Sequence, residues 1–357
     1  MRGFVLLALA LVTALGPQRS AAQLSKAAWD ALNGGRVQEA AAAFDEALRA
    51  APQQPMLLLG AGVAARLQGR TDDARRFLVD ALRTEPGLTA ASLLLGNLLY
   101  QAGDIDAAID TYQRALMLAP EQPQLIKQLE AWRKEALLHS GFGRKLGDHF
   151  TVLFEGPAEA DLATRAVAIL ESAYWRIGTA LYTYPTDVVT VILYTREQFR
   201  DITQSPEWAG GAFDGRIRVP VQGALQNRAE FERVLAHEFT HALIQSIAAR
   251  GVPAWLHEGL ADCFDGTDIT RKAEQVRNAR TLLPLPRLEG SFAGLSAAEA
   301  SLAYAESAVA VRALLDQAGA PAVVNLLGDL GRGTPFPDAF QRNILMSYIE
   351  FQKNLQD

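Results

Sequence analysis

The first third of the chain repeats itself with a period of 34 residues. Three prolines, three glycines and two sets of three alanines all share this spacing (Pro52, Pro86 and Pro120; Gly35, Gly69 and Gly103; Ala40, Ala74 and Ala108; Ala47, Ala81 and Ala115). A large side chain recurs in the same register, at Phe44, Leu78 and Tyr112. Several columns with a single period predict a stack of equal units, in which each unit buries its apolar face against its neighbours.

The residue type in each column predicts that every unit is a pair of helices. Each glycine falls between two amphipathic stretches, where a tight turn favours a residue that can adopt positive φ. The alanines allow two helices to approach closely, the large residues fill the groove between them, and each proline ends the second helix. We expect the amphipathic segment Gln124 to Leu138 to follow as a cap over the open apolar edge.

These columns resemble the tetratricopeptide repeat, with three copies over about residues 21–122 and a weak early tryptophan position. The resemblance implies an all-α solenoid, which we place with its cap at residues 23–139. Solenoids present an extended concave surface, so we expect the array to bind a protein or peptide partner. A purely structural spacer is the alternative interpretation.

The extreme N-terminus has the layout of a secretory signal over residues 1–22. Arg2 supplies a positive start, residues 4–15 are almost wholly apolar, and the small residues 20–22 suit a signal peptidase. We expect cleavage after Ala22 and export to a bacterial periplasm or beyond the cell, with an uncleaved anchor as the alternative. The apolar run is shorter than the roughly 20 residues of a transmembrane helix, so no membrane span is expected after cleavage.

Composition narrows the classes of function. The formal net charge of −6 gives no basic footprint, so we expect no nucleic-acid partner. Hydrophobic residues make up 49% of the chain, which argues against bulk disorder. The single cysteine, Cys263, allows neither an internal disulfide nor a cysteine-based zinc site, and we expect it to be a small buried residue.

The second half is predicted to be an α+β domain over residues 148–357, joined to the array by a glycine-rich and basic linker at 140–147. Hydrophobic alternation and periodicity predict three strands and two long helices. The strands are expected at 149–155, 187–195 and 216–221, and the helices at 159–181 and 227–250. A sheet followed by helices is typical of the α+β class.

The helix predicted at 227–250 contains the run His237-Glu238-Phe239-Thr240-His241. Residues four apart lie on one helix face, so both imidazoles can reach one ion. Glu238 is close enough to act on a water molecule bound to that ion. Because zinc lowers the pKa of such a water to about 7, a nearby carboxylate can then take its proton. The alternative is a pair of histidines on a solvent-facing helix.

A catalytic zinc site needs a third protein ligand, with the fourth position left to water. A second helix is predicted after Pro253, and it would return Glu258 to face the two histidines. Asp262, one turn further along the same face, could hydrogen-bond a ligand histidine. His257 competes for the role of third ligand, but it points about 100° away from Glu258 on a helix, so Glu258 is favoured.

Together, residues 237–241 and the run Trp255-Leu256-His257-Glu258-Gly259-Leu260-Ala261 resemble the gluzincin zinc peptidases of the MA clan, specifically the small bacterial peptidase-MA-like domains. The resemblance covers about residues 148–345 and is sharpest at these two motifs. It implies a thermolysin-like fold in which Glu258 is the third zinc ligand. It also implies a sheet edge, expected at 216–221, that binds an extended peptide. It also implies a downstream residue that stabilises the oxyanion. Tyr304 is the candidate, and ordinary helix packing is its alternative.

The sequence therefore predicts an exported zinc metallopeptidase that hydrolyses a peptide or protein substrate. A repeat-containing adaptor with a structural or inactive peptidase-like domain is the alternative. Hydrolysis of a non-protein amide is a weaker third hypothesis. The ligand set favours zinc but also accepts other divalent ions.

Overall fold

The computed structural model describes residues 20–204, 211–221 and 227–355. The predicted signal peptide lies almost wholly outside the described residues. The first helix, α1 (Ala21–Asn33), begins after Ser20, whose side chain accepts a hydrogen bond from the backbone N–H of Gln23. The predicted cleavage after Ala22 therefore falls in the first turn of α1. Within the described residues, no helix is both long and apolar enough to cross a membrane.

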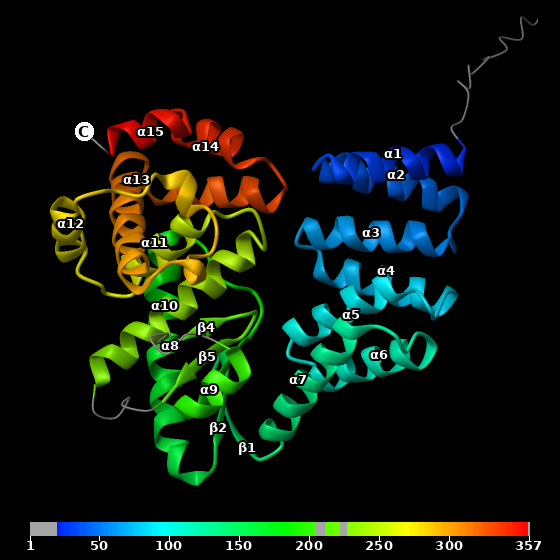
Figure 1. Ribbon diagram of the computed structural model, residues 1–357, viewed down its shortest axis with the longest axis horizontal. Coiled ribbons are helices and arrows are strands. Elements are labelled where there is room, and N and C mark those ends of the chain that lie inside the picture. Colours follow the sequence, from blue (N-terminus) through cyan, green and yellow to red (C-terminus); the bar gives the residue numbers. More distant parts are fainter. Residues whose placement is uncertain (1–19, 205–210, 222–226, 356–357) are drawn as a thin grey trace, which may run out of the picture.

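The 34-residue units are three helix pairs stacked side by side (Figure 1). The pairs are α1 with α2 (Val37–Ala50), α3 (Pro55–Leu67) with α4 (Thr71–Thr84), and α5 (Thr89–Gln101) with α6 (Ile105–Leu118). Gly35, Gly69 and Gly103 all have positive φ, as the tight turns between paired helices require. The stack ends in α7 (Pro123–His139), where buried Trp132 packs against Tyr112.

A five-stranded sheet follows, in the order β1-β2-β3-β5-β4. Strands β2, β3 and β5 pair in parallel. Each outer strand is antiparallel to its neighbour, β1 to β2 and β4 to β5. The strands are β1 (Phe142–Leu146), β2 (Phe150–Glu155), β3 (Val189–Tyr194), β4 (Ala212–Phe213) and β5 (Ile217–Pro220). Between them lie a short 3-10 turn (Pro157–Glu159), α8 (Ala160–Leu181) and α9 (Arg196–Thr203).

Two parts of this sheet differ from the sequence expectation. Strand β1 occupies most of the segment 140–147, which the sequence predicts to be a linker. The glycine at position 143 makes room for the ring of Phe154 on the paired strand, because a Cβ atom there would lie 2.8 Å from that ring. The segment expected as the sheet edge, 216–221, is the internal strand β5. The edge strand next to β5 is β4, which is only two residues long and too short to leave a periodic signal.

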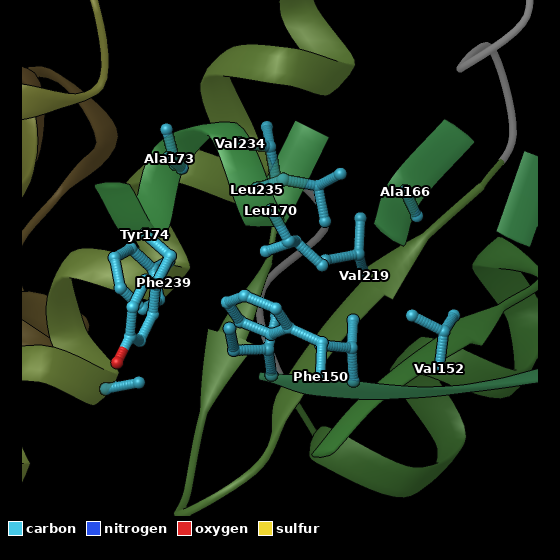
Figure 2. Close-up of a cluster of buried hydrophobic side chains, with 14 of the residues drawn as sticks. Phe150, Val152, Ala166, Leu170, Ala173, Tyr174, Val219, Val234, Leu235 and Phe239 are labelled. Atoms are coloured by element: carbon cyan, nitrogen blue, oxygen red, sulfur yellow. The ribbon is translucent and has the colours of Figure 1, made fainter. Parts of the chain in front are cut away.

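Helices α8 and α10 (Arg228–Ile247) pack on one face of the sheet and form the core shown in Figure 2. Phe150 from β2 meets Phe239 from α10, with ring centroids 5.5 Å apart. This contact, together with Leu170 and Leu235, fixes the helix that carries the histidine motif against the sheet.

The remaining helices follow α10, and all of them except α12 contribute side chains to a second core. They are α11 (Ala254–Phe264), α12 (Ile269–Asn278), α13 (Ala297–Gly331), α14 (Phe336–Ile344) and α15 (Tyr348–Asn354), with 3-10 turns at Leu285–Leu288 and Phe292–Gly294. Helix α13 kinks at Gly319, which has a φ of 78° and precedes Pro321. Trp255 and Leu256 of α11 are fully buried in this core. The chain is thus an all-helical repeat region followed by a mixed domain with a small sheet.

Candidate metal centre and its cleft

Helices α10 and α11 bring three potential metal ligands together. The carboxylate Oε2 of Glu258 lies 3.5 Å from Nε2 of His237 and 3.5 Å from Nε2 of His241. One ligand atom from each of these residues lies within 4.8 Å of the other two. The sequence prediction for these positions rested on helical spacing, and the structure brings the three side chains to one point.

The chemistry of this donor set fits a zinc ion. Two imidazole nitrogens and one carboxylate oxygen are the ligands of many catalytic zinc sites, which leave a position open for water. All three side chains are largely buried, with 14%, 9% and 23% of their surfaces exposed for His237, His241 and Glu258. Residues so close together and so shielded from solvent need a cation or shared protons between them.

The pKa shifts have the direction expected for such a cluster. Burial opposes a charge on His237, but hydrogen bonds to Asp265 and Glu258 outweigh it and raise its pKa to about 10. Burial likewise opposes the charge on Glu258. The neighbouring His241 and His237 outweigh burial and hold the pKa of Glu258 well below its usual range. A cation bound at this point would replace a proton.

The ring of His237 is oriented from its other nitrogen by Asp265. Nδ1 of His237 lies 3.1 Å from Oδ2 of Asp265, which also accepts a hydrogen bond from Arg233 at 2.9 Å. Asp262, the residue that the sequence analysis singled out, lies 3.6 Å from the same nitrogen and pairs with Lys272. Sequence reasoning missed Asp265, although it lies three residues beyond Asp262 and therefore near the same face of α11.

His257 contacts the Nδ1 side of His241 and is not one of the three converging ligands. The two Nδ1 atoms are 2.6 Å apart, and the rings stack with centroids 4.6 Å apart. Burial, with the charge of His241, lowers the pKa of His257 to about 3, so this ring is neutral. It can therefore orient His241, while Glu258 takes the position facing both Nε2 atoms.

Glu238 lies beside the cluster in a tight space. Its side chain is 5% exposed, and its Oε2 has no hydrogen-bond partner in the part of the chain that the structure describes. A Cβ atom at Gly211 would lie 2.4 Å from Oε1, so any larger residue there would have to displace the carboxylate. Burial raises the pKa of Glu238, which suits a group that accepts and returns a proton.

A cleft of about 800 Å³ opens onto these groups, lined by His237, Glu238, Glu258 and Tyr304 among others. Burial, together with the charges of Glu258, Asp262 and Glu238, raises the pKa of Tyr304. The phenol therefore keeps its proton and remains a hydrogen-bond donor. A second cavity of about 960 Å³ lies between α8 and the start of α10, and its lining includes none of the three converging residues.

Models of known protein families match segments in both halves of the chain. Residues 175–348, which contain the two motifs, match the model described as the Peptidase MA superfamily. Residues 25–88 and 65–132 match two tetratricopeptide-repeat models. The predictions of a peptidase-MA-like domain and of tetratricopeptide repeats are thus confirmed. No curated protein matches the chain.

Two solved structures show weak likeness. One is the first tetratricopeptide domain of Spaghetti (RPAP3) bound to the HSP90 peptide SRMEEVD, with 19% identity and a TM-score of 0.32. That match covers 33% of this chain and 96% of the other. The second is the myosin chaperone UNC-45 from C. elegans in complex with an Hsp90 peptide, with 11% identity and a TM-score of 0.31. That match covers 95% of this chain and 33% of the other.

Proposed function

We propose that this protein is an exported zinc metallopeptidase of the gluzincin type with a thermolysin-like catalytic domain. His237, His241 and Glu258 would hold the metal. The observation that carries the proposal is their convergence within 4.8 Å, beside a buried glutamate whose Oε2 has no hydrogen-bond partner among the described residues. Such a constellation, open to a cleft, is what metal-assisted hydrolysis needs.

Each residue then has a defined task. His237, His241 and Glu258 would hold a zinc ion, which when bound would supply polarisation of a carbonyl group and a lowered pKa for a water molecule. Glu238 takes the proton of the attacking water and later delivers it to the leaving amine. Tyr304 donates a hydrogen bond to the developing oxyanion. Asp265 and His257 keep the two ligand imidazoles in orientation.

We further propose that the repeat array binds the protein substrate or a partner protein. Helical solenoids present broad surfaces for this purpose. The proposal of export rests on residues 1–22, whose charge and apolar pattern are those of a secretory signal.

Elemental analysis of the purified protein, combined with a peptide-library hydrolysis assay, tests the proposal. We expect about one zinc per chain in the wild type and in Glu238→Gln, and loss of zinc in His237→Ala. Hydrolysis should fall by roughly 10²–10⁴-fold in Glu238→Gln, because only the proton acceptor is removed.

Two outcomes would contradict this assignment. Loss of zinc from Glu238→Gln would exclude a purely catalytic role for that residue. A folded wild-type chain that takes up no zinc when it is supplied would favour the adaptor, in which the peptidase-like domain is structural.

A further inference from the structure

A buried charged cluster joins the repeat array to the sheet. Glu135 on α7 faces Arg216 and Arg218, which flank Ile217 at the start of β5. The carboxylate Oε1 lies 3.1 Å from Nη2 of Arg216 and 2.9 Å from Nη1 of Arg218. All three side chains are at most 3% exposed, so the cluster is removed from water.

Tyr100, near the end of α5, completes the cluster from the third repeat. Its hydroxyl donates to Oε2 of Glu135 at 2.5 Å and accepts from Nη2 of Arg218 at 2.7 Å. The guanidinium carbon of Arg216 lies 4.1 Å from the centre of the tyrosine ring. Both arginines are therefore held by the same two residues of the array.

The same arginines fix the local shape of the β4–β5 hairpin. Nε of Arg218 donates to Asp214 in the turn at 3.0 Å, and Nη1 donates to Tyr194 on β3 at 2.7 Å. Successive residues of a strand face opposite sides, so Ile217 and Val219 enter the core under α10 while the arginines face the array. The hairpin is thus clamped between α10 and the repeats.

The hairpin also reaches the candidate catalytic base. Helix α10 contacts both β4 and β5. Gly211, directly before β4, leaves so little space that a Cβ there would lie 2.4 Å from Oε1 of Glu238. A displacement of the hairpin therefore changes the space available to that carboxylate.

We propose that the repeat array is a positioning element of the cleft, in which Tyr100 and Glu135 hold the β4–β5 hairpin and the hairpin fixes the backbone beside Glu238. Tyr100 and Glu135 are positioning residues, since they touch neither the metal ligands nor Glu238. The effect on catalysis rests on the proposed function, whereas the holding of the hairpin does not.

A second contact between the halves provides a matched control. Nζ of Lys134, next to Glu135 on α7, lies 3.0 Å from Asp201 on α9. Both side chains are more than half exposed, so this ion pair lies at the surface, apart from the buried cluster. Lys134→Ala therefore removes an ion pair between the array and the second domain without affecting the buried cluster.

Hydrogen exchange on the full chain, read by mass spectrometry, tests the holding of the hairpin. In Tyr100→Phe and Glu135→Gln we expect peptides covering residues 211–221 to exchange at least about tenfold faster than in the wild type. In the same two variants, peptides from α13 should exchange at the wild-type rate. In Lys134→Ala, peptides covering residues 211–221 should also exchange at the wild-type rate. Tyr100→Phe keeps the ring and removes only the hydroxyl. It is therefore informative even if Glu135→Gln, which removes the carboxylate that the two buried arginines share, does not fold.

Steady-state kinetics on the zinc-loaded variants tests the link to Glu238. We expect kcat to fall roughly tenfold in Tyr100→Phe at unchanged zinc content, because small displacements of catalytic groups are costly. Lys134→Ala should keep the wild-type kcat and KM. A loosened hairpin with wild-type kcat and KM would overturn the link to the cleft.

Two results would overturn the proposal as a whole. One is wild-type exchange at residues 211–221 in both variants, and the other is an equal acceleration throughout the second domain, which signifies general destabilisation. A zinc-loaded wild type that hydrolyses no peptide would refute the proposed function instead, and hydrogen exchange alone would then decide whether the array holds the hairpin.

Discussion

His237 is held from both ring nitrogens. Nε2 faces Glu258 at 3.5 Å and Nδ1 faces Asp265 at 3.1 Å. A carboxylate on the second nitrogen of a metal-binding histidine fixes the tautomer and makes the other nitrogen a better ligand. Asp265 is itself anchored by Arg233 and by the backbone N–H of Thr267, so its position is well determined.

Replacing this anchor gives a residue-scale prediction. Asp265→Asn should weaken zinc binding by about 10–100-fold, because an amide orients the ring without its negative charge. Asp262→Asn is the matched control and should have a smaller effect, since Asp262 is neutralised by Lys272 and lies further from the ring. Competition with a chromogenic chelator measures both affinities, and the reverse ranking would return the anchoring role to Asp262.

The raised pKa of His237 predicts how zinc affinity depends on pH. Its pKa is about 10 without metal, so between pH 6 and 9 the metal-free ring carries a proton that the complex does not. Zinc binding must release this proton, and apparent affinity should rise about tenfold per pH unit. Calorimetry in buffers of different ionisation enthalpy counts the protons. Affinity that stays level across this range would show that His237 is already neutral.

At the scale of elements, the close crossing of α11 and α13 sets where Glu258 points. A Cβ atom at Gly259 would lie 2.3 Å from the backbone oxygen of Ser307, and a backbone atom cannot rotate away. The glycine next to the third ligand is therefore required by helix packing. Because the two helices are in such close contact, a small shift of α13 would also move α11 and the side chain of Glu258.

Gly259→Ala should accordingly lower the free energy of unfolding by about 1–3 kcal/mol, the usual cost of overpacking a core. Gly290→Ala is the control, because a Cβ atom there would meet no heavy atom within 4 Å. Urea denaturation of both variants measures the difference. If Gly259→Ala were as stable as Gly290→Ala, the two helices would have to separate without cost.

The long elements were predictable because each carries a period. The 34-residue columns locate the helix pairs, and the histidine spacing locates the face of α10 that meets Glu258. Strands β1 and β4 were missed because one is glycine-containing and basic and the other has only two residues. Asp265 and the contact of His257 with His241 depend on the angle between α10 and α11, which the sequence alone does not determine.

At the scale of the whole molecule, the repeats and the mixed domain meet through buried polar groups. Glu135, Arg216 and Arg218 lie between them, and Tyr194 and Phe142 pack there with Leu138 of α7. Burying such charges stabilises little by itself, but removing one partner is costly. The buried ion pairs form only when the two halves are docked in this orientation, so they fix the halves relative to each other.

His139 makes this junction sensitive to acid. It lies at the end of α7, and its Nε2 is 2.7 Å from the hydroxyl of Tyr194 on β3. Burial is the main cause that lowers its pKa from 6.5 to about 4, and the nearby Arg216 and Arg218 act in the same direction while Glu135 opposes them. Between pH 6.5 and 4 the unfolded chain therefore binds a proton at this position that the folded chain does not.

The sign of the effect follows from this difference. Stability rises with pH wherever the unfolded state binds more protons, so the contribution is complete above pH 6.5 and is lost as pH falls toward 4. The wild type should lose roughly 1–3 kcal/mol more than His139→Gln over this window, a range reduced for the partial exposure of the ring. Urea denaturation at a series of pH values measures both. Because the carboxylates are the same in the two proteins, parallel profiles would mean that His139 is already protonated in the folded junction.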